Sequence, residues 1–175
     1  MQAVVSFLIL IVFCGQVKSN DETDLQFESL SSKSSVDFNE LFGPLLNLEN
    51  EKPYDFNELL NTSSKPTHSV WVLYQKNCKS CHQMMQESSK CLKKNKSLKI
   101  YFVGILSKKQ TLLQVAIDHK VYKLAWYSKL DLIKKLNLDV TPTVFLFEKN
   151  KLLKRVESSM SCKEIKNLFN KVKAS

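Results

Sequence analysis

A short apolar run that ends at a pair of cysteines constrains the fold of this chain most. Residues 70–74 read Val-Trp-Val-Leu-Tyr, a β-branched and aromatic composition that is typical of a buried strand. A short polar turn leads to Cys-Lys-Ser-Cys at 78–81, and a helical pattern continues over 82–92. The sequence therefore predicts a strand that delivers a C-x-x-C pair to the N-terminus of a helix.

This predicted arrangement suits dithiol redox chemistry. A thiolate at Cys78 would lie at the positive end of the helix dipole, which stabilises it. Cys81 follows about one turn later, close enough to form a disulfide with Cys78. Lys76 and Lys79 add positive charge, and we expect them to lower the pKa of the Cys78 thiol by about one unit.

The remaining periodic segments predict an α/β domain. Ser161 and Glu164 fit a capping box at the start of the last helix. The expected strands cover 98–106, 143–147 and 152–156, the last two as a hairpin, and the expected helices cover 110–121, 129–136 and 161–172.

The N-terminal third differs from this domain. Residues 3–14 are apolar apart from Ser6 and predict a secretory signal peptide that is cut before Asn20. Two near-copies, 37–42 and 55–60, each begin with Asp and carry Glu three residues later, which predicts two short helices. We expect a signal peptide at 1–19, an acidic, partly disordered or short-helical arm at 20–54, and a domain at 55–175.

Charge and composition exclude some classes of function. The formal net charge is +9, yet residues 20–66 hold ten acidic and three basic residues. The basic residues of the domain are scattered lysines with one arginine, which favours a solvated surface over a nucleic-acid site. With three glycines in the chain, no glycine-rich phosphate-binding motif occurs.

A second motif, Val-Thr-Pro-Thr at 140–143, lies just before a predicted strand. The order of C-x-x-C helix, strand, helices, Thr-Pro, hairpin and closing helix resembles the thioredoxin superfamily over residues 55–173. The resemblance implies a thioredoxin fold with a central mixed sheet, flanking helices, helices inserted before a cis-proline at Pro142, and a helical N-terminal arm.

The same resemblance implies an exported thiol–disulfide oxidoreductase without a metal or an organic cofactor. Cys78 would attack and Cys81 would resolve the mixed disulfide, while Thr141 and Pro142 would line the substrate groove. The expected partners are cysteine-containing protein substrates and a redox partner protein. We expect a periplasmic or secreted location, no nucleic-acid partner, and no stable membrane insertion after signal cleavage.

Two finer resemblances concern subfamilies. Thr141 before the proline resembles periplasmic isomerases, which are commonly dimeric, and the acidic arm could supply such a dimer contact. The stretch 98–121, with Gln75 and the surroundings of the cysteines, looks similar to thioredoxin-like proteins of bacterial conjugative elements. That second resemblance implies a role in folding secreted or conjugation-apparatus proteins.

Three other interpretations stay open. The motif ending in His82 also fits C-x-x-C-H, the attachment motif of c-type haem, with Met160 as a distal ligand. The four cysteines Cys78, Cys81, Cys91 and Cys162 could hold zinc. A non-enzymatic protein could use the groove for peptide binding alone. Within the oxidoreductase reading, Cys91 and Cys162 are free thiols, a second disulfide, or auxiliary redox cysteines.

Overall fold

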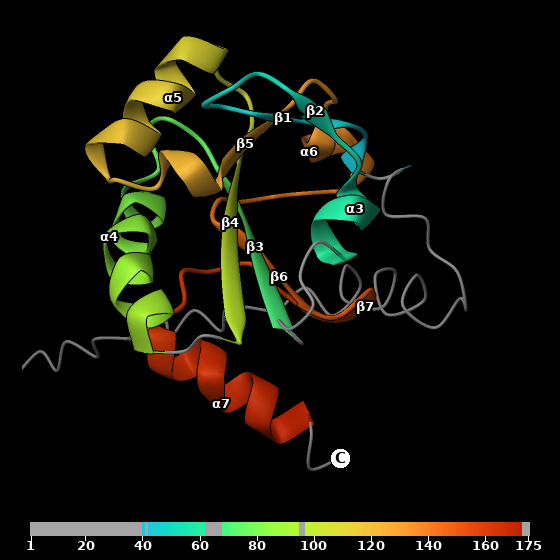
Figure 1. The fold of residues 1–175 in the computed structure, drawn as a ribbon, viewed down its shortest axis with the longest axis vertical. Coiled ribbons are helices and arrows are strands. Elements are labelled where there is room, and N and C mark those ends of the chain that lie inside the picture. Colours follow the sequence, from blue (N-terminus) through green and yellow to red (C-terminus); the bar gives the residue numbers. More distant parts are fainter. Residues whose placement is uncertain (1–39, 41, 62–67, 95–96, 173–175) are drawn as a thin grey trace, which may run out of the picture.

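A computed structural model describes residues 40, 42–61, 68–94 and 97–172 (Figure 1). The predicted signal peptide and most of the acidic arm lie outside these residues. The strands are β1 (Leu45–Asn47), β2 (Pro53–Tyr54), β3 (His68–Tyr74), β4 (Leu98–Gly104), β5 (Ala125–Ser128), β6 (Thr143–Glu148) and β7 (Lys151–Val156). The helices are α3 (Phe56–Asn61), α4 (Lys79–Lys94), α5 (Lys109–Asp118), α6 (Leu132–Lys135) and α7 (Cys162–Val172), with a 3₁₀ turn η1 (Tyr122–Leu124).

The seven strands form one mixed sheet in the order β2-β1-β5-β4-β3-β6-β7. Strands β3, β4 and β5 run parallel, whereas β6 pairs with β3 in the antiparallel sense and forms a hairpin with β7. Every residue of β3 is buried, which explains its continuous apolar sequence. This mixed sheet with flanking helices is the predicted arrangement.

Helices cover both faces of the sheet and enclose two cores. Figure 1 shows α4 and α7 on one side, and α3 and α6 on the other. Alternate residues of β3 supply the two cores, as the two-residue period of a strand requires. Val70, Val72 and Tyr74 pack in the core beneath α4. Trp71 and Leu73 pack in the second core, which is rich in aromatic rings.

The N-terminal segment differs from the prediction. Residues 45–47 and 53–54 are strands β1 and β2 of the main sheet, so this part of the expected arm is neither helical nor separate. The helix expected at 55–60 is present as α3, and the side chain of Asp55 accepts hydrogen bonds from the backbone N–H groups of Asn57 and Glu58 at 2.8 and 3.3 Å. Most of the helix expected at 37–42 falls outside the described residues.

The insertion between β4 and Pro142 also holds more than helices. It contains α5 and α6, as expected, but also η1 and strand β5, which pairs with both β4 and β1. The closing helix has its predicted cap: the Ser161 N–H donates to a Glu164 carboxylate oxygen at 2.7 Å, and the Glu164 N–H donates to the Ser161 hydroxyl at 3.3 Å. No described helix combines the length and apolar character that crossing a bilayer requires.

Candidate active site

Cys78 and Cys81 form a disulfide at the start of α4, with their Cα atoms 5.2 Å apart. Cys78 acts as the cap of the helix. Its sulfur accepts the backbone N–H of Cys81 at 3.1 Å, and its carbonyl accepts the N–H of His82 at 3.1 Å. Its own N–H donates to the carbonyl of Gln75 at 3.2 Å. One of the donors that a helix N-terminus leaves unpaired, the N–H of Cys81, is therefore directed at this sulfur.

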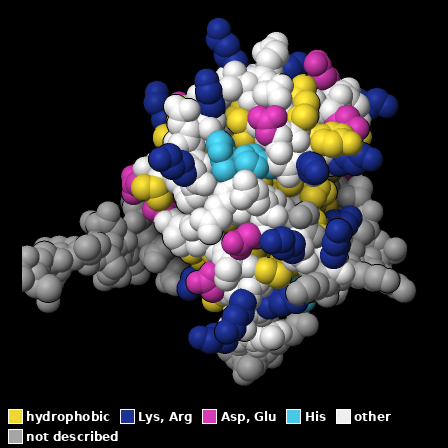
Figure 2. Space-filling model, turned by 90° about the vertical axis from the view of Figure 1, so that its left-hand side faces the viewer, with side chains coloured by type: hydrophobic (Ala, Val, Ile, Leu, Met, Phe, Trp, Pro, Cys, Tyr) yellow, Lys and Arg dark blue, Asp and Glu magenta, His cyan; other side chains and the backbone are white. Residues whose placement is uncertain are grey.

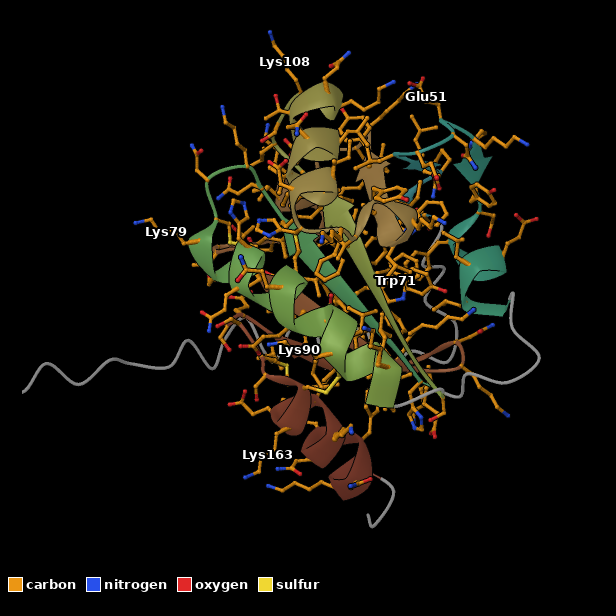
Figure 3. All side chains as sticks on the ribbon, turned by 60° about the vertical axis from the view of Figure 1, so that its left-hand side comes forward. Glu51, Trp71, Lys79, Lys90, Lys108 and Lys163 are labelled. Atoms are coloured by element: carbon orange, nitrogen blue, oxygen red, sulfur yellow. A yellow bond between two sulfur atoms is a disulfide. The ribbon has the colours of Figure 1, made fainter. Side chains whose placement is uncertain are left out.

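The two sulfurs differ in access. Cys78 is 7% exposed, and Cys81, in the first turn of α4, is fully buried. Lys76 and Lys79 beside them are exposed. Figure 3 shows Lys79 extending into solvent from the first turn of α4, near a sulfur atom. Cys78 is therefore the more accessible of the two cysteines and has exposed lysines on either side, whereas Cys81 is shielded.

The structure brings the Thr-Pro motif to the same end of the sheet. The Thr141–Pro142 peptide bond is cis. Thr143 pairs with Leu73 in the β3–β6 ladder, which places residues 141–142 beside the turn that follows β3. The amide Nε2 of Gln75 donates to the Thr141 hydroxyl at 3.0 Å, and the Thr143 hydroxyl donates to the Val140 carbonyl at 2.7 Å. The sequence motifs that lie more than 60 residues apart thus adjoin in space.

Arg155 anchors the same loop from the other side. Its guanidinium donates to the carbonyls of Leu136 and Asn137 at 2.9 and 2.8 Å, and it pairs with Glu157. These carbonyls lie at the end of α6, where a helix leaves acceptors without intrahelical partners. Arg155 on β7 therefore fixes the chain just before it enters the Thr141–Pro142 loop. No local pattern predicts this role, because the contact joins residues far apart in the chain.

Two histidines lie together near the start of α4. His82 follows Cys81, and its ring centroid is 4.8 Å from that of His119, which follows α5. Burial and the nearby His82 lower the pKa of His119, although Asp118 opposes this shift. The buried Nε2 of His82 has no hydrogen-bond partner among the described residues. Figure 2 shows histidine side chains gathered at one spot of this face, with lysines around them.

The second cysteine pair is also a disulfide. Cys91 in the last turn of α4 is joined to Cys162, the first residue of α7, with a Cα separation of 5.5 Å. Cys91 is 1% exposed, and both cysteines line a small cavity with Met160. Of the three interpretations left open for this pair, the structure contains the disulfide.

The alternative cofactor sites fit this arrangement poorly. The four cysteines that zinc would need are paired two by two at opposite ends of α4. Among the described residues, no group of three or more metal-binding side chains is clustered. Met160 lies beside Cys91, about 15 Å along the helix from Cys81 at 1.5 Å per residue, so it does not face His82 as a distal haem ligand would.

Comparisons with solved structures found proteins of the same fold. A secreted disulfide oxidoreductase of Mycobacterium tuberculosis, homologous to DsbE of E. coli, is 12% identical, with a TM-score of 0.59 over 75% of this chain and 96% of that protein. StoA from Bacillus subtilis is 17% identical, with a TM-score of 0.54 over 71% and 94%. A thioredoxin-like protein from Aeropyrum pernix is 10% identical, with a TM-score of 0.60 over 86% and 98%.

These likenesses at low identity show the fold, and they give no support to the resemblance with proteins of conjugative elements. A search of curated proteins found no match. The family evidence comes from the sequence itself, since the model of the thioredoxin-like domain family matches residues 56–173, from α3 to the end of α7. The chain therefore belongs to the thioredoxin-like domain family and has a thioredoxin fold.

Proposed function

We propose that this protein is a thiol–disulfide oxidoreductase that exchanges disulfides with cysteine-containing polypeptides through Cys78 and Cys81. One observation carries the proposal. Cys78, which is 7% exposed and held at the N-terminus of α4, is bonded to the fully buried Cys81 and lies beside the Thr141–Pro142 loop. The fold that this chain shares with known disulfide oxidoreductases supports the same reading.

Each half of the exchange is a displacement at sulfur. A substrate thiolate attacks the sulfur of Cys78, the Cys78–Cys81 bond breaks, and Cys81 leaves as a thiolate that takes a proton from solvent. A second substrate thiolate then attacks the substrate sulfur of the mixed disulfide, which releases the oxidised substrate and the reduced Cys78. The reverse sequence reduces a substrate disulfide, and a redox partner protein restores the starting state.

The residues around the sulfurs have separate tasks in this scheme. The backbone N–H of Cys81 at the start of α4, together with Lys76 and Lys79, stabilises the thiolate of Cys78. The buried position of Cys81 protects it from outside thiols, so that it reacts with the mixed disulfide at Cys78. Thr141 and Pro142 line the groove in which the substrate backbone lies.

We further propose that the protein acts outside the cytoplasm, in a periplasmic or secreted location. The apolar segment 3–14 has the character of an export signal. The Cys91–Cys162 disulfide is of the kind that persists in oxidising compartments. One of the structurally similar proteins is a secreted oxidoreductase.

The test uses a short peptide with two cysteines, in its oxidised and reduced forms. Cys81→Ser should accumulate a mixed disulfide between Cys78 and the oxidised peptide, visible by mass spectrometry without reductant. Cys78→Ser should lose exchange down to the background rate. The double variant Cys91→Ser with Cys162→Ser is the matched control, and it should still exchange.

Two results would contradict the assigned roles. One is a Cys81→Ser protein that turns over normally, and the other is a Cys78→Ser protein that retains exchange. A wild-type protein that binds the peptide yet leaves its cysteines unchanged would instead fit the non-enzymatic alternative.

A further inference from the structure

Gln75 contacts both halves of the candidate active site. Its backbone carbonyl accepts the N–H of Cys78 at 3.2 Å, which fixes the turn that carries the reactive sulfur. Its side-chain amide donates to the Thr141 hydroxyl at 3.0 Å, which fixes the loop next to Pro142. One residue therefore links the attacking group to the loop that would hold the substrate.

The link lies between two buried strand ends. Tyr74, the residue before Gln75, ends the central strand and is fully buried. On the other side, Thr143 is buried and begins β6. Gln75 and Thr141 themselves are only partly buried and lie just outside the ladder between β3 and β6. Their side-chain hydrogen bond thus spans the gap that the backbone ladder leaves between the two site segments.

We propose that Gln75 is a positioning residue that sets the Thr141–Pro142 loop relative to the sulfur of Cys78 and so favours polypeptide substrates over small thiols. The inference rests on the proposed exchange reaction. A polypeptide must contact the Thr141–Pro142 loop and Cys78 at the same time. The rate of its exchange reaction therefore depends on the distance between the loop and the sulfur. A small dithiol needs access to the sulfur alone.

Removing the bond between Gln75 and Thr141 should reduce the rate with a polypeptide by about what one neutral hydrogen bond contributes. Because Gln75 and Thr141 are half-buried, each can turn to water when the other is replaced, and no buried orphan group results. The loop keeps its other anchors, namely the bonds from Thr143 to Val140 and from Arg155 to Leu136. Loss of the link should therefore displace the loop without unfolding it, and slow the polypeptide reaction about fivefold.

The experiment measures two rate constants for each oxidised protein. One is for a ten-residue peptide with two thiols, and the other is for dithiothreitol. Gln75→Met and Thr141→Val remove the amide and the hydroxyl at nearly constant shape. Thr141→Ser keeps the hydroxyl and is the conservative control. The double variant Gln75→Met with Thr141→Val tests whether both changes act through one bond.

We expect the ratio of the peptide rate to the dithiothreitol rate to fall about fivefold in Gln75→Met and in Thr141→Val, a loss of one neutral hydrogen bond. The double variant should fall no further than either single variant. Thr141→Ser keeps the hydroxyl, so its ratio should fall less than that of Thr141→Val. Should one single variant fail to fold, the other reports on the same bond, since each carries one partner.

Other outcomes overturn the inference. If the rates with the peptide and with dithiothreitol fall in parallel, Gln75 has a general structural role. An unchanged ratio of the two rates, together with a lower midpoint of unfolding, would indicate the same. Losses that multiply in the double variant would show two independent effects. If the wild-type protein reacts with neither reagent, the proposed function itself fails, and the inference fails with it.

Discussion

Helix α4 carries a disulfide at each end, and the two ends differ in almost every physical respect. At the N-terminal end, Cys78 is partly accessible and closes a short loop with Cys81, three residues away. At the C-terminal end, the buried Cys91 is joined across 71 residues to α7. Figure 3 shows sulfur at both places, beside Lys79 and between α4 and α7.

The helix dipole separates the two bonds chemically. Cys78 caps the N-terminus of α4 and Cys81 lies in its first turn, where the positive end of the dipole stabilises a thiolate. Cys91 lies in the last turn, where unpaired carbonyls disfavour one. Reduction at the first end therefore releases thiolates that the positive end of α4 stabilises. At the second end, Cys162 is half-buried at the start of α7, but an attack on it releases the Cys91 thiolate in buried, unfavourable surroundings. In the proposed exchange reaction, the position along α4 therefore favours the first bond over the second.

The largest predicted difference concerns stability. In the chain-entropy model, a disulfide across 71 residues stabilises the fold by about 4 kcal/mol, and one across three residues by about 2 kcal/mol. Cys91→Ala with Cys162→Ala should therefore lower the free energy of unfolding about twice as much as Cys78→Ala with Cys81→Ala. Urea unfolding of the oxidised proteins measures both. Equal losses, or a greater loss at the first end, would refute the assignment of the structural bond to Cys91–Cys162.

The next prediction concerns the order of reduction. As dithiothreitol is raised under native conditions, Cys78 and Cys81 should become available for alkylation before Cys91 and Cys162. An attack on Cys162 must expel the buried thiolate of Cys91, which is a poor leaving group at that end of the helix. Peptide mapping of alkylated protein by mass spectrometry identifies the sites. Alkylation of Cys91 first, or of all four together, would show that the dipole and burial do not separate the two bonds.

Local sequence patterns predict much of the fold, and the strands that they do not predict share one physical cause. Strand β3, the C-x-x-C helix, the final hairpin and the capped last helix were predicted because periodicity and caps are local signals. Strands β1, β2 and β5 were missed. They are two to four residues long and exist only through pairing with distant strands, as β5 does with β4 and β1.

The site divides in the same way. The cysteine pair and the Thr-Pro motif are short sequence motifs, so their residues could be predicted from the sequence. The contacts that hold these motifs together could not. Gln75 bonds to Thr141 across 66 residues, and Arg155 reaches back to Leu136 and Asn137. Single glutamine and arginine residues have no pattern that predicts such partners.

The smallest predicted effect is on the pH dependence of stability, which should differ between a group near the first end of α4, His119, and a group near the second end, Glu164. Near Cys78, burial and His82 hold the pKa of His119 below its ordinary value of 6.5, against the opposing effect of Asp118. Near Cys162, the Ser161 hydroxyl and N–H hold the pKa of the exposed Glu164 carboxyl below its ordinary value of 4.5. Both groups bind a proton less readily in the folded protein than in the unfolded chain. Their contributions to stability are therefore complete above those ordinary values and are lost as the pH falls through the lower folded values.

The measurement is the unfolding free energy as a function of pH for wild type, His119→Gln and Glu164→Gln. The difference between wild type and His119→Gln should change as the pH falls below about 6.5, while the difference for Glu164→Gln should stay constant there and change only below about 4.5. In both cases the stability of the wild-type protein relative to the variant decreases toward acid, because the folded state binds its proton only at a lower pH than the unfolded chain does. A His119→Gln difference that is flat across pH 5–7, or that grows toward acid, would contradict the lowered pKa of His119. A Glu164→Gln difference that changes in the higher range would mean that the two ends of α4 do not titrate separately.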